Sequence, residues 1–92
     1  MGKNEDMKLA MVTSITEVLK IRKGKKDVNH EEMMRELEGV IRKVRDKDSR
    51  LMMIVAASKT LDVLNRNPKM SDKEVMKKMV QDFDAMIQQS AE

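Results

Sequence analysis

Hydrophobic residues recur along most of the chain at spacings of three and four, which places them on one face of an α-helix. Four such stretches can be distinguished, over about residues 5–23, 30–45, 49–65 and 72–89. Three of them have a single apolar face and are predicted to be amphipathic helices packed on a common core. The apolar positions in these three stretches are Met7, Met11, Ile15, Val18 and Leu19; Met33, Leu37, Val40, Ile41 and Val44; and Val75, Met79, Phe83, Met86 and Ile87.

Two of the predicted helices have explicit start signals. Asn29 is followed by Glu32, and Ser71 by Glu74, which is the spacing of a capping box. In such a box the cap side chain accepts a hydrogen bond from the backbone N–H three residues on, and the Glu side chain reaches back to the cap. Helices are therefore predicted to start near residues 30 and 72. The first helix is predicted to stop at Gly24, in the left-handed conformation that often follows a helix.

The third stretch differs because it has no polar face over two turns. Residues 51–57 are all apolar, and polar residues return only from Ser58 onward. A helix that is apolar all round is normally buried. Asn67-Pro68 should end this helix, because the residue before proline disfavours α geometry. Since the connections are short, consecutive helices should be antiparallel neighbours. The sequence thus predicts an all-α, single-domain, antiparallel four-helix bundle with a buried third helix.

The composition indicates a core built largely from methionine. The 92 residues include eleven methionines and one aromatic residue, Phe83, and the chain is too apolar, at 40% hydrophobic residues, for the disordered class. No apolar run approaches the roughly 18–20 residues that span a bilayer, and the N-terminus lacks the apolar segment of a signal peptide. The chain has no cysteine, which excludes disulfides and thiolate metal sites. We expect a cytoplasmic protein that does not enter membranes.

No catalytic or metal-binding motif is recognisable. His30 begins a segment like the zinc motif HExxH, but Met34 stands where the second histidine is needed, and His30 is the only histidine. No serine or threonine shows a base partner in the sequence, and the three scattered glycines form no phosphate-binding loop. We therefore expect a protein that is not an enzyme, with no cofactor and no small-molecule substrate.

Adjacent methionines suggest a surface for a partner helix. Neighbouring residues on a helix point about 100° apart, so one methionine of a pair can face the core while the other lies at its edge. Because methionine is flexible and polarizable, such surfaces adapt to varied partners. The interpretation left open is that methionine simply fills a core that lacks aromatic residues. The candidate contacts with a partner protein or a second copy of the chain are Met34, Met52, Met53 and Met76.

A second candidate surface is basic. Residues 19–26, Leu-Lys-Ile-Arg-Lys-Gly-Lys-Lys, contain five basic side chains. The three before Gly24 are explained as a last helical turn, where cations offset the negative end of the helix dipole, but the two after Gly24 are not. An antiparallel bundle would bring this segment beside the start of the fourth helix. The candidate phosphate contacts are Lys23, Lys25, Lys26, Lys69, Lys73 and Lys77.

Binding of nucleic acid by this basic end meets two objections. Single-strand binding relies on aromatic platforms, which the chain lacks. A helix-turn-helix made from the third and fourth helices would have an unusually long turn, and Asp72 and Glu74 would repel DNA. We therefore predict a non-enzymatic protein–protein interaction or regulatory module, self-association included. The alternative is a nucleic-acid-binding regulator that uses residues 20–26 and 69–78.

Overall fold

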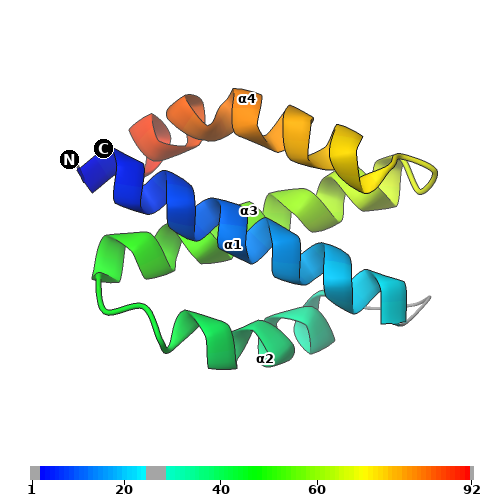
Figure 1. Ribbon diagram of the computed structural model, residues 1–92, viewed down its shortest axis with the longest axis horizontal. Coiled ribbons are helices and arrows are strands. Elements are labelled where there is room, and N and C mark those ends of the chain that lie inside the picture. The colour runs from blue at the N-terminus through cyan, green and yellow to red at the C-terminus, as the bar shows by residue number, and fades with distance from the viewer. Residues whose placement is uncertain (1–2, 25–28, 92) are drawn as a thin grey trace.

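The computed structural model describes residues 3–24 and 29–91, which form four α-helices and no strand. Helix α1 spans Lys3–Gly24, α2 spans His30–Ile41, α3 spans Lys47–Arg66 and α4 spans Asp72–Ala91. The helices run alternately up and down, so that consecutive helices are antiparallel (Figure 1). The predicted all-α four-helix bundle is therefore confirmed.

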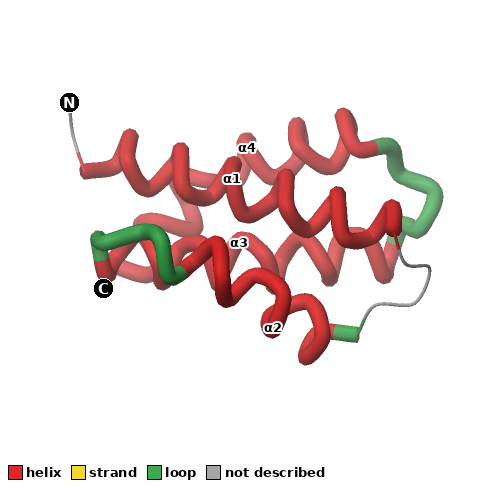
Figure 2. The backbone as a smooth tube through the Cα atoms, turned by 60° about the horizontal axis from the view of Figure 1, so that its bottom comes forward, coloured by secondary structure: helices red, strands yellow, loops and turns green. Residues whose placement is uncertain are grey.

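Helices α1 and α3 form the centre of the bundle. They cross one another, while α2 packs against both on one flank and α4 packs against both on the other (Figure 1). Within the described residues, α2 and α4 make no contact with each other. Figure 2 shows the two described connections, at opposite ends of the bundle. None of these four helices combines the length and the apolar character needed to cross a membrane.

Both central helices carry small buried side chains. Ala10 and Ser14 of α1 and Ala56 and Ala57 of α3 are all buried. Ser14 is fully buried, and its Oγ donates a hydrogen bond of 2.7 Å to the carbonyl oxygen of Met53. A side chain this short reaches the backbone of another helix only where the two helices approach closely. Small residues therefore set the separation of the central pair.

The core agrees with the predicted apolar faces of α1 and α4, all of whose positions are buried. The prediction for α2 is correct only in part, because Met33 and Leu37 are buried while Val40, Ile41 and Val44 are partly exposed. Val40 and Ile41 lie in the last turn of α2, and Val44 is no longer helical because α2 ends at Ile41 instead of continuing to residue 45. Its end tightens into bonds between residues three apart, and Val44 lies in the connection.

Both predicted helix starts are confirmed by their caps. The Asn29 side chain accepts a hydrogen bond of 2.7 Å from the backbone N–H of Glu32. At the start of α4, the Glu74 N–H donates to Ser71 Oγ at 3.2 Å, and Ser71 Oγ donates to Glu74 Oε1 at 2.9 Å. Each cap satisfies a backbone donor that has no partner within the helix.

A third cap was not predicted. The Asp46 carboxylate accepts hydrogen bonds from both the N–H and the Oγ of Ser49, at 3.2 and 2.7 Å. Helix α3 therefore begins at Lys47, two residues earlier than expected. At the other end of α1, the prediction of a left-handed Gly24 is wrong, because Gly24 is the last helical residue and no described glycine has a positive φ.

The buried hydroxyl of Ser14 gives a test of the α1–α3 contact. Ser14→Ala should lower the free energy of unfolding by about 0.5–1.5 kcal/mol, because it removes one buried hydrogen bond. Ser14→Leu should cost about 1–3 kcal/mol or more, because a larger side chain forces the helices apart. Chemical denaturation measures both values. The control is Thr13→Ala on the exposed side of α1, where the hydroxyl bonds only within the helix. Equal costs for the leucine variant and the control would contradict close packing.

An exposed glycine inside α2 gives a second test. A Cβ at Gly39 would meet no atom within 4 Å, so alanine fits without strain. Gly39→Ala should raise the free energy of unfolding by about 0.5–1 kcal/mol, since alanine restricts the unfolded chain. In a domain of this size, 1 kcal/mol corresponds to a rise of about 4–8 °C in Tm. Thermal unfolding followed by circular dichroism measures the change. A lower Tm would contradict the placement of Gly39 as an exposed helical residue with open space around it.

Candidate interaction surfaces

The structure corrects the predicted methionine surface. Met52 and Met53 are 1% and 0% exposed, so their assignment as partner contacts is wrong. The reason is that α3 is covered by three other helices, and two side chains about 100° apart can therefore both face the interior. Met34 and Met76 are partly buried at the edge of the core, as expected. They belong to α2 and α4, which lie on opposite flanks, so the four methionines do not form one strip.

The exposed apolar residues of α3 were not predicted from the sequence. Leu51 is 49% exposed and Ile54 is 40% exposed, although both belong to the segment that was predicted to be buried all round. Helix α3 is central, but its side facing away from α1 remains open between α2 and α4. In the N-terminal half of the helix, this open side is apolar. The continuous apolar run in the sequence could not show which of its members face outward.

A groove between α2 and α3 adjoins these residues. Its volume is about 460 Å³, and Ile54 of α3 together with Met34 and Ile41 of α2 supplies its apolar lining. Both α2 residues also pack against the core. Charged side chains surround the apolar lining: Glu31, Arg35, Glu38 and Arg42 of α2 and Arg50 of α3. The groove therefore combines an apolar floor with a charged rim, which is the usual make-up of a protein-binding surface.

One hydrogen bond joins the two helices beside this groove. His30 Nε2 lies 3.0 Å from Ser58 Oγ, a contact that the sequence did not indicate. A serine acting as a nucleophile also needs nearby donors for an oxyanion. Ser58 lies within α3, where the backbone N–H groups are already bonded inside the helix. The pair is therefore best explained as a tie between α2 and α3.

The basic end of the bundle is partly neutralised. Lys23 Nζ lies 2.8 Å from the Asp72 carboxylate, so this candidate phosphate contact already has a partner. Arg22 Nη2 donates a hydrogen bond of 2.9 Å to the carbonyl oxygen of Pro68. These two contacts tie the end of α1 to the connection between α3 and α4. Here the structure shows a role in packing where the sequence suggested only the helix dipole.

The remaining lysines at this end are solvated. Lys69, Lys73 and Lys77 are exposed on the last connection and on α4. Lys25 and Lys26, also predicted to bind phosphate, lie outside the described residues. An exposed lysine makes a flexible, salt-sensitive phosphate contact but reads no base sequence. The structure thus places three of the candidates near one another but adds no feature specific to nucleic acid.

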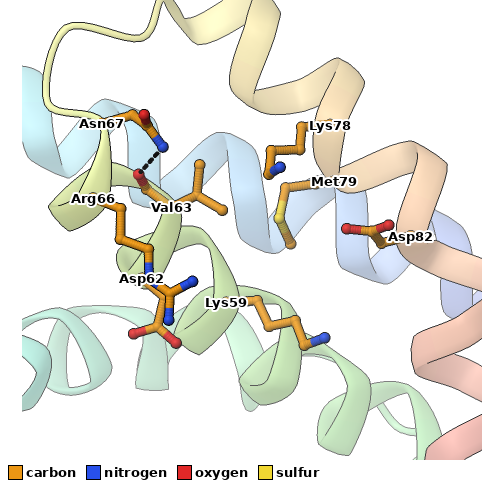
Figure 3. Close-up of a pocket in the computed structure, with 8 residues that line it drawn as sticks. All are labelled: Lys59, Asp62, Val63, Arg66, Asn67, Lys78, Met79 and Asp82. Carbon is orange, nitrogen blue, oxygen red and sulfur yellow. Dashed lines mark hydrogen bonds between the residues drawn. The ribbon is translucent and has the colours of Figure 1, made fainter.

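A second hollow, of about 360 Å³, lies between α3 and α4 (Figure 3). Charges of both signs line it, and all of its charged side chains are exposed. Asn67 Nδ2 donates to the carbonyl oxygen of Val63 at 3.5 Å, which closes the end of α3. Among the lining side chains, Met79 alone is buried. The hollow therefore offers no desolvated polar group that would fix a ligand. Elsewhere in the described residues, no group of three or more His, Cys, Asp or Glu side chains could hold a metal ion.

The flank formed by α1 and α4 also exposes apolar residues. Leu9 is 69% exposed and Val80 is 47% exposed. Lys8 Nζ pairs with the Asp84 carboxylate at 2.9 Å between the same two helices. This flank lies on the side of the bundle away from α2. The α1–α4 flank and the α2–α3 groove are therefore two separate places where aliphatic side chains are exposed.

Comparison of the chain with protein-family models, with curated proteins and with solved structures gave no match. The function must therefore be inferred from the chemistry of these surfaces. The α2–α3 groove places aliphatic side chains next to charged side chains of both signs, which lie along α2 and at Arg50 of α3.

Proposed function

We propose that this protein is a non-enzymatic interaction or regulatory module that binds protein through the α2–α3 groove. The observation that carries the proposal is the exposed Ile54, which lines one groove with the partly buried Met34 and Ile41, together with the exposed Leu51 three residues before it on α3. Removing apolar surface from water contributes about 25 cal/mol per Å². A cluster of aliphatic side chains with a charged rim is therefore suited to a partner that covers it.

The chemistry of the groove supports a protein partner over a small molecule. Small-molecule sites are enclosed and place a few polar groups at fixed positions. Here the polar groups are long, exposed arginine and glutamate side chains, which suit the periphery of a broad contact. Methionine at position 34 adds a flexible side chain that adapts to the surface laid against it. The proposed location is the cytoplasm, in keeping with a chain that has no cysteine.

Site-specific photo-crosslinking tests this proposal. A photoreactive phenylalanine analogue in place of Ile54 should form a covalent adduct with a protein in the cells that express the chain. The matched control replaces Gln81, an exposed residue of α4 outside the groove. Adding Leu51→Arg to the Ile54 probe should lower the adduct yield about tenfold, because it places a charge in the apolar contact. Equal yields from the two probes, or an unchanged yield with Leu51→Arg, would contradict the proposal.

A nucleic-acid-binding regulator is the second candidate, supported by the exposed Lys69, Lys73 and Lys77. Against it, the connection between α3 and α4 has five residues, from Asn67 to Ser71, and is longer than a helix-turn-helix requires. Duplex-DNA binding at about 50 and about 200 mM salt separates the two functions. Binding that falls steeply with salt and is lost on Lys73→Glu plus Lys77→Glu would favour this second candidate.

A further inference from the structure

The outer edge of α2 carries a row of charges with alternating signs. Glu31, Arg35, Glu38 and Arg42 follow one another at steps of four, three and four residues, and all four are exposed. Side chains at these spacings lie along one line of a helix. This row forms the rim of the α2–α3 groove on the α2 side. Within the helix, Glu38 and Arg42 form an ion pair.

This charge row is complementary to itself when its direction is reversed. Glu31 and Arg42 are equally far from the point between residues 36 and 37, and so are Arg35 and Glu38. If a second α2 runs antiparallel across that point, each glutamate faces an arginine of the other copy. A parallel arrangement would instead place glutamate beside glutamate and arginine beside arginine.

The apolar residues of the groove follow nearly the same symmetry. Met34 and Ile41 are centred only one residue further along α2 than the charge row. The antiparallel arrangement therefore brings Met34 of one copy close to Ile41 of the partner subunit. Ile54 of α3 lines the same groove, and Leu51, three residues before it on α3, is exposed as well. A two-fold axis thus places the two grooves against each other, and each copy covers the apolar floor of the other copy's groove.

We infer that the occupant of the α2–α3 groove is a second copy of this chain, with α2 packed antiparallel against α2 of the partner about a two-fold axis. The inference rests on the proposed function, in which this groove is a protein-binding surface. An isologous contact of this kind closes on itself and yields a dimer. A contact between this groove and the α1–α4 flank would instead be head-to-tail and would build open chains.

The apolar and the charged residues have different parts in the dimer. Exposed ion pairs contribute little to affinity, because each charge is already solvated. They do penalise any register that brings like charges together, and so they fix direction and alignment. Burial of Met34, Ile41, Leu51 and Ile54 supplies the attraction. The contact is small compared with standard interfaces, so the dimer should be weak and dependent on concentration.

Charge reversal along the row tests the arrangement by sedimentation equilibrium over about a hundredfold range of protein concentration. The wild type should form a dimer. Glu31→Arg with Glu38→Arg makes the row wholly basic, and Arg35→Glu with Arg42→Glu makes it wholly acidic. Each double variant alone should dimerise about tenfold more weakly or worse. An equal mixture of the two should form a mixed dimer with an affinity within about threefold of wild type.

Two matched controls show whether the position of a substitution matters, as opposed to the change in net charge or the loss of an exposed aliphatic side chain. Lys73→Glu with Lys77→Glu changes the net charge as much as the acidic row variant does, but on α4, and should leave the dimer unchanged. Ile54→Arg should abolish the dimer, whereas Val80→Arg, at a similarly exposed aliphatic residue on the other flank, should not. Circular dichroism verifies that every variant is folded.

Several outcomes would overturn the inference, and they leave the proposed function separately testable. If the wild type dimerises and Ile54→Arg abolishes the dimer, but the mixture does not recover it, the groove binds protein in another register. If Val80→Arg abolishes the dimer, the contact lies on the wrong flank. A wild type that stays monomeric at every concentration refutes the second copy as occupant. Crosslinking from position 54 then decides independently whether the groove binds a different protein.

Discussion

The close packing of α1 on α3 is the constraint on which the rest of the structure depends. Ser14 Oγ reaches the carbonyl oxygen of Met53 at 2.7 Å, and Ala10, Ala56 and Ala57 of the same two helices are also buried. Because the central helices fill the middle of the bundle, α2 and α4 can pack only on opposite flanks of that pair (Figure 1). The bundle therefore has two separate outer faces, each formed by a different pair of helices.

This geometry explains why a central helix also presents a surface. Helix α3 is covered by α1, and on its two flanks by α2 and α4, but the side opposite α1 stays open. Buried positions such as Met52 and Met53 occupy the covered part of its circumference, while Leu51 and Ile54 fall on the open part. In the proposed dimer, these exposed residues supply the attraction. The charge row of α2 supplies direction, because exposed ion pairs affect alignment more than affinity.

The sequence predicts best where apolar residues recur at helical spacing and where a cap is followed by a glutamate three residues later. Every apolar position predicted for α1 and α4 is buried, and the caps at Asn29 and Ser71 were found because each has its glutamate three residues later. The cap at Asp46 was not predicted although Ser49 stands three residues on, because no glutamate or glutamine occupies that position to complete a capping box.

The outward-facing residues could not be predicted, because their exposure depends on which helices meet. An apolar run such as residues 51–57 has no periodicity that distinguishes a flank from a buried face. The ion pairing of the basic end could not be predicted for a related reason. A count of lysines cannot show that Lys23 is paired with Asp72, which lies in another helix 49 residues further along the chain. The charges of α2 are visible in the sequence, but their position on the rim of an apolar groove is not.

The central claim is that two copies of α2 pack antiparallel, and distances between spin labels in the dimer test it most directly. The chain has no cysteine, so a single cysteine at Gly39 or at Lys43 takes one label per copy. Position 39 lies in open space in the last turn of α2, nearer the proposed two-fold axis, and position 43 lies just beyond the end of the helix. With a rise of about 1.5 Å per residue, the antiparallel dimer predicts a longer distance between labels at position 43 than at position 39, by up to about 12 Å along the helix. Equal label-to-label distances at the two positions would contradict the antiparallel dimer. So would the absence of a measurable distance between labels on two copies at either position.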